Sequence, residues 1–469
     1  MTITTQTIPT NPKAKKEPKV EHSSETPRIL VPENLSFGEA ATYCTKKAQE
    51  EEAIAPVVRA FRCLPWAGAY ATERVLDSEF SAVGVKTTEI LVPAAGGRQR
   101  KIRWGTWEVA GLGTVEQGVN FGTDSIEYIV VVKCKRKDAP RAEALHDRIE
   151  AEIEKRELYS GCAVMLEPNN EGKLYLERPP KVVDLEKINP SDVVLEDSLS
   201  ASVRAELFMP ITHSERVARA GVPIRRGVLL AGRPGTGKTM SARVAARLAI
   251  DKGWTAFYLP DARAVEGALR IAAAHQPAVL ICEDLDRQLG GERNAETDRI
   301  LNALDGLDRS AKVIFIATTN DPDSLPAPLL RPGRMDTLLF FGLPDAQAAL
   351  RLLNKYLGDR RLLDPADGER AATACAGLLP ASIREVASRS ILHAMNRNAT
   401  DSFTINADDV VEAAISVHQQ QRKLEDAEKV KAHLPAMRVF THSNATQEEM
   451  VAAAIAMRGM DAKADSIDD

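Results

Sequence analysis

The middle of the chain, between residues 226 and 320, alternates short apolar runs with segments of helical periodicity. The runs are continuous rather than alternating, which is typical of strands buried on both faces of a sheet. The segments between them repeat apolar residues at helical spacing. This order predicts an α/β module, a parallel sheet with helices on both faces. The predicted strands are residues 227–231, 256–259, 278–282 and 313–317, and the predicted helices are residues 240–250 and 264–275.

The preceding segment, residues 36–181, has a different pattern. Two helices are predicted first, followed by strands of mixed or alternating polarity and one charged helix with a single apolar face. This mixture predicts an α+β domain that is separate from the α/β module. The predicted helices are residues 39–61, 70–80 and 141–158, and the predicted strands are residues 88–92, 100–109, 126–134 and 162–166.

Residues 232–239 read Gly-Arg-Pro-Gly-Thr-Gly-Lys-Thr, which fits the phosphate-binding pattern G-x-x-x-x-G-K-[ST] at every fixed position. The glycines let consecutive backbone N–H groups turn toward phosphate oxygens, and the following helix adds the positive end of its dipole. Lys238 supplies a charge for the β- and γ-phosphates, and the Thr239 hydroxyl is placed to bind Mg²⁺. The predicted nucleotide-binding residues are Gly232, Pro234, Gly235, Thr236, Gly237, Lys238, Thr239 and Met240.

Polar side chains follow the next two apolar strands of the module. Glu283 and Asp284 come directly after residues 278–282, and Asn320 comes shortly after residues 313–317. Open α/β sheets bind ligands at the carboxyl ends of their strands. One acid is needed to face Mg²⁺ and another to accept the proton of an attacking water. We therefore expect Glu283 on the metal side with Thr239, and Asp284 and Asn320 in catalytic positions.

Two arginines, Arg331 and Arg334, are separated by a rigid Pro-Gly turn. A turn of this kind does not easily fold back onto its own phosphate loop, but it suits presentation to the γ-phosphate of a neighbouring subunit. An ordinary surface turn has the same composition. The position of the pair downstream of the phosphate loop and the acids favours arginine fingers that act in trans.

Together the motifs at residues 232–239, 279–286, 317–320 and 330–336 resemble those of the AAA family of ring-forming ATPases, over about half of the chain. The resemblance implies a P-loop AAA module that binds ATP and Mg²⁺ and works as a homo-oligomer, commonly a hexamer, to remodel a protein or protein complex. The domains predicted on this basis are a disordered arm at 1–35, a recognition domain at 36–181, a large nucleotide-binding subdomain at 190–342, a helical lid at 343–418 and a polar extension at 419–469.

Two features depart from the common family pattern. Most members carry Asp followed by Glu in the second motif, whereas Glu283 followed by Asp284 resembles the Bcs1-like branch. An Asp in the base position is shorter by one methylene, about 1.5 Å, so either the backbone compensates or turnover is slow. In addition, no aromatic residue lies between Tyr258 and the acids. Rings that thread a peptide usually carry one there, so this absence disfavours threading.

Composition limits the alternatives. The 469 residues suffice for about three domains, and 61 basic against 66 acidic residues give no overall case for a nucleic-acid binder. The six cysteines form no Cys-x-x-Cys pair, so neither a zinc site nor a disulfide framework is predicted. No apolar run approaches the ~18 residues of a membrane span. We expect a cytoplasmic protein.

One segment of the recognition domain leaves a nucleic-acid function open. Arg98, Arg100, Lys101 and Arg103 are interleaved with tryptophans, a mixture that suits single-stranded nucleic acid but also the solvent-facing side of an ordinary strand. The second interpretation is favoured. The domain itself resembles the N-terminal domains of bacterial and phage AAA proteins. The alternative functions are a nucleic-acid-dependent motor or loader and a nucleotide-switched scaffold with little turnover.

Overall fold

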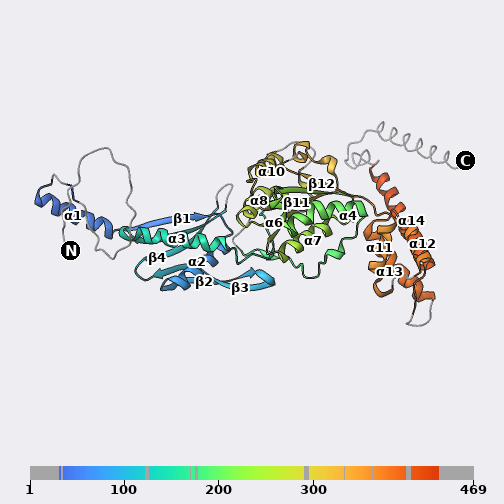
Figure 1. Ribbon diagram of the computed structural model, residues 1–469, viewed down its shortest axis with the longest axis horizontal. Helices are drawn as coiled ribbons and strands as arrows, with labels where there is room; N and C mark the ends of the chain where they lie inside the picture. Colours follow the sequence, from blue (N-terminus) through green and yellow to red (C-terminus); the bar gives the residue numbers. More distant parts are fainter. Residues whose placement is uncertain are drawn as a thin grey trace, which may run out of the picture. The chain divides into compact units, whose positions relative to one another are not determined.

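The computed structural model describes residues 31–432, except residues 33–34, 122–125, 170, 175–177, 290–294, 332, 361–363 and 398–402. Contacts within this part of the chain divide it into two compact units, the first ending at Gly342. Most of the predicted arm and the last 37 residues of the predicted extension, 433–469, lie outside the described residues. The first unit contains two separate β-sheets, which are blue to teal and green to yellow in Figure 1.

The first sheet is antiparallel throughout, and two helices pack against it. Its inner strand β5 alternates buried positions with more exposed ones, which is the pattern of a sheet with one covered face. In β5, for example, Tyr128, Val130 and Val132 are fully buried. The spatial order is β1 (Ile54–Phe61), β5 (Ile126–Lys135), β4 (Gly113–Phe121), β3 (Arg98–Val109) and β2 (Ala82–Ala94), and the covering helices are α2 (Pro65–Glu79) and α3 (Ala139–Glu154).

The helix predicted at residues 39–61 is wrong in its second half. Helix α1 (Phe37–Glu52) begins at a capping box formed by Ser36 and Glu39 and ends before β1. Pro56 removes a backbone donor, which a helix interior does not tolerate but an edge strand does. Strand β4, which is polar and contains two glycines, was not predicted.

The second sheet is parallel over six of its seven strands, and helices cover both of its faces. Small alanines of α7 (Lys238–Asp251) pack with Val228, Ile281 and Ile316 on one face. Apolar residues of α8 (Val265–Ala274) and α10 (Ala295–Gly306) pack on the other. The predicted α/β module is confirmed. The strand order is β12 (Thr337–Phe341), β8 (Arg226–Gly232), β11 (Val313–Thr319), β10 (Ala278–Cys282), β9 (Thr255–Leu259), β6 (Ala163–Met165) and β7 (Lys181–Val182).

One predicted strand lies in a different sheet from the one expected. The sequence pattern predicts residues 162–166 as a strand of the recognition domain, yet β6 pairs with β9 in the parallel sheet. The N–H of Ala256 donates to the Cys162 carbonyl at 2.8 Å, which begins this pairing. A short buried apolar run does not indicate which sheet it joins. The position of residues 162–166 in the sequence, next to the recognition domain, therefore does not predict their sheet.

Three short helices lie between β7 and β8 of the parallel sheet, and a fourth follows the acids. A π-helical turn, Arg204–Phe208, joins two of them. They are α4 (Asp197–Val203), α5 (Met209–Thr212), α6 (Ser214–Arg219) and α9 (Asp286–Leu289).

The second unit is helical and falls where a lid is predicted. Asp345 caps its first helix by accepting from the N–H of Ala348 at 2.7 Å. Buried residues such as Leu353, Ile383 and Val386 form its core. Its helices are α11 (Ala346–Leu357), α12 (Pro365–Cys375), α13 (Pro380–Arg397) and α14 (Ala407–Ala432), the last of which includes the start of the predicted extension.

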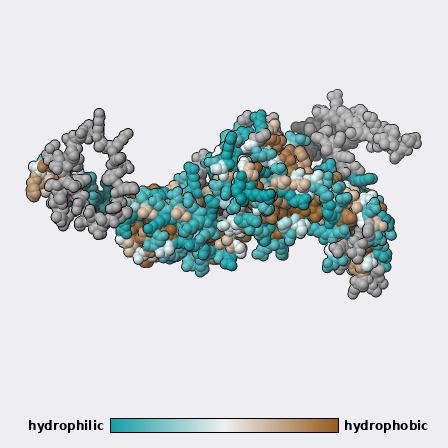
Figure 2. All heavy atoms as spheres, in the orientation of Figure 1, coloured by the Kyte–Doolittle hydropathy of each residue, from teal (hydrophilic) through white to brown (hydrophobic). Residues whose placement is uncertain are grey.

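Hydrophilic residues cover most of the face seen in Figure 2, and apolar residues gather near β12. Leu338 and Phe340 of that strand are exposed, Phe340 by 60%. Within the described residues, every helix is too short or too polar to cross a membrane.

Candidate functional site

The glycine loop after β8 is shaped by backbone that other residues do not easily adopt. Gly232, Gly235 and Gly237 have φ values of 153°, 82° and 106°. A side chain on Gly232 would collide with the Phe341 carbonyl of the adjacent strand β12. Gly237 is the N-cap of α7, and no side chain caps the helix there. The first N–H groups of α7 therefore remain available to an anion.

Lys238, the first residue of α7, lies inside this loop. Its Nζ donates to the carbonyls of Gly232 and Arg233 at 2.6 and 2.9 Å and to Asn320 Oδ1 at 2.8 Å. Burial lowers the pKa of the ammonium, whereas Asp284 and Asp286 raise it. Lys238 as a whole is only 6% exposed, so its charge lies in a partly desolvated site. In such a site the attraction between the ammonium and an anionic ligand is stronger than between exposed charges.

Asp284 and Asn320 are brought together by the ends of two adjacent strands. The N–H of Asp284 donates to Thr318 Oγ1 at 3.0 Å, and Asn320 Nδ2 donates to Asp284 Oδ1 at 3.1 Å. Asp284 has a φ of 52°, a left-handed backbone that is uncommon outside glycine and clusters at functional sites. Lys238, Asn320 and Asp284 thus form one chain of hydrogen bonds at the carboxyl edge of the sheet.

Glu283 is half-buried at the end of β10. Burial raises the pKa of its carboxyl, Arg243 of α7 opposes this, and Asp284 adds a smaller increase. Glu283 and Thr239 offer a carboxylate and a hydroxyl, which are donors that Mg²⁺ accepts. Among the described residues, no group of three or more His, Cys, Asp or Glu side chains is arranged to hold a metal. The donors fit an ion that takes most of its ligands from phosphates and water, as Mg²⁺ does.

Two residues that stabilise this edge were not singled out from the sequence. Asp286 Oδ1 accepts from the N–H of Asn320 at 3.1 Å, and Thr318 supplies the acceptor for Asp284. Asp286 follows the acids by two positions, so its place beyond the strand was a usable signal. Thr318 is one of two adjacent threonines at the end of β11, and nothing in the pattern distinguishes it from Thr319.

The two arginines predicted as equivalent fingers have different surroundings. Arg334 donates twice to Asp305 of α10, at 3.0 and 2.6 Å, and once to the Pro328 carbonyl at 2.8 Å. Arg331 is exposed. Its carbonyl accepts from the N–H of Arg334 at 3.2 Å, but its side chain makes no hydrogen bond or ion pair with the described part of the chain. Between them, Asp336 accepts from the N–H of Gly333 at 2.7 Å. Arg334 therefore helps to hold the turn, and Arg331 is free to reach another molecule.

The connection from β9 to α8 is short, as predicted. Asp261 accepts from the N–H of Arg263 at 2.9 Å and pairs with its guanidinium. A single 3₁₀ turn, Ala262–Ala264, then leads into α8. No aromatic side chain is presented between Tyr258 and this helix.

Most of the basic residues that suggested nucleic-acid binding are paired within the chain. Arg103 binds Glu73 and Asp77, and Lys101 binds Glu89. Arg100 lies over the ring of Tyr70, at 4.7 Å from guanidinium carbon to ring centre. These pairs favour the interpretation as an ordinary solvent-facing strand.

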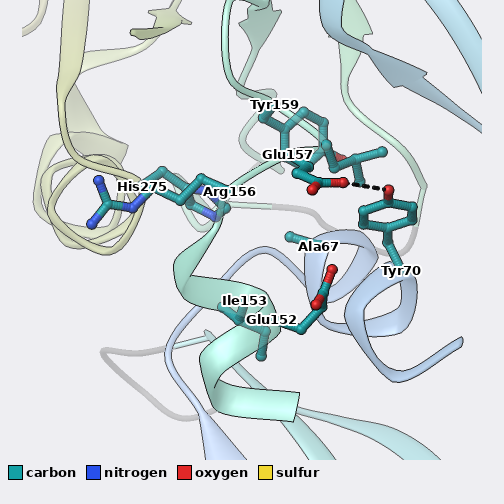
Figure 3. Close-up of a pocket in the computed structure, with 9 residues that line it drawn as sticks. Ala67, Tyr70, Glu152, Ile153, Arg156, Glu157, Tyr159 and His275 are labelled. Atoms are coloured by element: carbon teal, nitrogen blue, oxygen red, sulfur yellow. Dashed lines mark hydrogen bonds between the residues drawn. The ribbon is translucent and has the colours of Figure 1, made fainter. Parts of the chain in front are cut away.

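A cavity of about 10 Å³ lies where α2 and α3 approach α8 (Figure 3). Tyr70, Glu157, Tyr159 and His275 are among its lining residues. His275 is buried, accepts from the N–H of Leu64 at 3.0 Å through Nε2, and has its pKa lowered to about 4 by burial. His275 therefore serves the packing between α2 and α8. The cavity holds one water molecule at most and shares no residue with the glycine loop.

Comparisons with known proteins match the same region. Residues 228–343 match the family described as ATPase family associated with various cellular activities (AAA). The chain is similar to an ATP-dependent zinc metalloprotease FtsH of Synechococcus, with 32% identity over 241 residues, 47% of this chain and 37% of that protein. It is 30% identical over 226 residues to a 26S proteasome regulatory subunit 6B homolog of Dictyostelium discoideum, 44% of this chain and 56% of that protein.

A third relative is covered more fully. A probable 26S proteasome regulatory subunit 10B of Caenorhabditis elegans is 30% identical over 283 residues, which are 55% of this chain and 69% of that protein. By contrast, the chain spans about half or less of the length of the other two relatives. Residues 228–343, which match the family, contain the glycine loop, both acids, Asn320 and the two arginines.

Proposed function

The chain belongs to the AAA family of ATPases, and we propose that it hydrolyses Mg²⁺-bound ATP in a homo-oligomeric ring, a hexamer as is common in the family, to remodel a protein or protein complex. The observation that carries this proposal is the hydrogen-bonded chain from Lys238 through Asn320 to Asp284. It joins the cation of the phosphate loop to the acid that would act on water.

Each residue of the site has a role that its surroundings support. The glycine loop and the start of α7 bind the phosphates, and Lys238 neutralises their charge. Thr239 and Glu283 hold Mg²⁺, which supplies further charge neutralisation when bound. Asp284 accepts the proton of the attacking water. Asn320 donates to Asp284 and thereby fixes the direction in which its carboxylate points.

The arginines complete the site from a neighbouring subunit. Arg331 is exposed and unpaired among the described residues, so we assign it the contact with the γ-phosphate of the next subunit. Arg334, bound to Asp305, contributes by holding the turn and its charge at the interface. Both are needed for turnover, but Arg331 acts directly on the transition state.

The substrate is proposed to be a protein recognised by the domain at 36–181. Two of the relatives are named as proteasome regulatory subunits and one as a metalloprotease, which supports a protein substrate. The short β9–α8 connection without an aromatic residue, together with the order Glu283 then Asp284, supports a Bcs1-like motor that does not thread a peptide. A cytoplasmic location remains a prediction.

The test measures phosphate release and particle mass with and without ATP, and repeats the rate with added DNA and RNA. We expect a rise in mass with ATP and steady turnover that nucleic acid does not stimulate. Assembly without turnover would instead indicate a nucleotide-switched scaffold, and stimulation by DNA or RNA a nucleic-acid motor. Asp284→Asn should assemble with Mg²⁺-ATP and fail to hydrolyse it, because only proton acceptance is lost.

A double substitution tests the order of the acids. Glu283→Asp combined with Asp284→Glu installs the common family order at the same strand end. Faster hydrolysis would mean that the natural order slows turnover. Loss of hydrolysis would mean that the left-handed backbone at Asp284 is shaped for the shorter side chain. Unchanged turnover in Asp284→Asn would remove Asp284 as the base.

A further inference from the structure

Tyr258, on β9, lies beside the metal-side acid although it belongs to no motif. Strands β9 and β10 are parallel, and their register places Tyr258 opposite Ile281. Glu283 directly follows β10, two positions after Ile281, so the alternation of side chains directs it to the face of Ile281. Arg243 of α7 acts electrostatically on both Tyr258 and Glu283, which agrees with this placement. Ile281 and Tyr258 pack with the alanines of α7 in the same core. Tyr258 and Glu283 therefore share the layer between the sheet and the helix that carries Lys238.

The hydroxyl of Tyr258 is buried and has no hydrogen-bond partner in the described part of the chain. The residue is only 7% exposed. Burying a hydroxyl without a partner is unfavourable, and phenylalanine would fill the same space without that cost. A buried donor of this kind at a ligand site is explained when the bound state supplies its acceptor.

The charges around the phenol indicate that acceptor. A phenol is a hydrogen-bond donor at neutral pH, and burial raises the pKa of Tyr258 further. Arg243 and Glu283 are the two charged groups that act on the phenol, Arg243 lowering its pKa and Glu283 raising it. Arg243 is exposed on α7, which leaves Glu283 as the charged acceptor on the buried side.

A hydrogen-bond donor beside Glu283 would help to fix the orientation of its side chain. Glu283 is one methylene longer than the Asp that the family usually carries at this position, so one more bond must be fixed when it faces the metal. We propose that Tyr258 is a positioning residue for Glu283: its hydroxyl donates to the Glu283 carboxylate, directly or through one water, in the Mg²⁺-nucleotide complex. This inference rests on the proposed function.

The test compares Tyr258→Phe with Tyr159→Phe in the full-length chain. Tyr159 is also a buried tyrosine whose hydroxyl has no partner in the described residues, but it lines the cavity of Figure 3. Calorimetry would measure binding of a non-hydrolysable ATP analogue over a range of Mg²⁺ concentrations. We expect Tyr258→Phe to weaken the apparent Mg²⁺ affinity by about tenfold, as removal of a group that orients a metal ligand does. In Tyr258→Phe, the affinity for the analogue without Mg²⁺ and the melting temperature of the protein should not fall. In the control Tyr159→Phe, the Mg²⁺ dependence of binding should be unchanged.

A double-mutant cycle distinguishes positioning from a general structural effect. Asp at position 283 is too short to receive the same hydrogen bond, so adding Tyr258→Phe to Glu283→Asp should cost no further Mg²⁺ affinity. Additive losses would overturn the inference, as would an unchanged Mg²⁺ dependence in Tyr258→Phe alone. If the natural chain itself neither binds the Mg²⁺-bound analogue nor hydrolyses ATP, the proposed function fails. If the natural chain hydrolyses ATP and Tyr258→Phe has the same Mg²⁺ dependence, only the role of Tyr258 is refuted.

Discussion

The two sheets of the first unit place their polar side chains in different ways. In the antiparallel sheet β1–β5, charged residues are spread along the strands, and pairs such as Lys133–Glu116 and Lys101–Glu89 form across neighbouring strands. In the parallel sheet, β9, β10 and β11 are buried at every position, and the charged residues come after the strands end. A sheet covered on both faces has no other place for charge, so its chemistry is concentrated at one edge.

The difference also separates strong interactions from weak ones. Lys101 and Glu89 are both well exposed, and exposed pairs of this kind contribute about 0–1 kcal/mol to folding. Lys238 and Glu283 lie in a partly desolvated site, where charge acts more strongly on a ligand. Substitutions should therefore have large effects on nucleotide chemistry at the parallel edge and small effects on stability in the antiparallel sheet.

The largest effect is expected for Lys238→Ala. The loop loses its cation in a site otherwise made of backbone dipoles, so ATP affinity should fall by about 100-fold or more. Titration calorimetry with an ATP analogue measures this, and Lys101→Ala is the matched loss of a lysine from the antiparallel sheet. Equal affinities for the two variants would mean that the glycine loop does not bind phosphate.

The arginine turn gives the next largest effect. Arg331→Ala should lower hydrolysis by about 10³-fold with ATP binding retained, since a finger stabilises charge in the transition state. Arg334→Ala should also lower the rate, and Asp305→Asn should resemble it because that substitution releases the same guanidinium. Phosphate-release assays measure all three variants.

Mixed rings test whether the site is shared between subunits. Arg331→Ala subunits combined with Lys238→Ala subunits should regain part of the activity, because each retains the half of the site that the other lacks. If co-assembly is verified and no activity returns, the arginines do not act in trans.

A smaller effect on stability is expected where the two sheets are joined. The pKa of His275 falls from 6.5 to about 4 on folding, so the unfolded chain binds a proton more readily than the folded one. The contribution of neutral His275 is complete above pH 6.5 and is lost as pH falls toward 4, by up to about 3 kcal/mol. Urea denaturation of the natural chain and of His275→Gln between pH 7 and 4 should show a steeper acid loss in the natural chain. Parallel curves would contradict this assignment.

The smallest effect is expected for Arg103→Ala in the antiparallel sheet. The substitution removes partly exposed pairs with Glu73 and Asp77, so the free energy of unfolding should fall by about 1 kcal/mol or less. ATP turnover and binding of single-stranded DNA, measured by fluorescence anisotropy, should not change. A clear loss of DNA binding would restore the nucleic-acid interpretation of residues 98–107.

The sequence predicted the parallel sheet better than the antiparallel one for a physical reason. Buried strands such as β10 and β11 are continuous apolar runs, and the glycine loop has a fixed spacing. Residues 54–61 and β4 carry no comparable signal, because half of each strand faces water and their pairing is set by distant residues. The same limit applies to the site: the different surroundings of Arg331 and Arg334 depend on Asp305, which belongs to another helix.

The crowding at Gly232 has a mechanical consequence. Gly232 pairs with Phe341 across two adjacent strands, and the absence of a side chain lets the two backbones lie in direct contact. Gly342, the last residue of the first unit, follows Phe341 directly. The loop backbone therefore cannot move closer to β12 without displacing Phe341, which lies two positions before the first residue of the second unit.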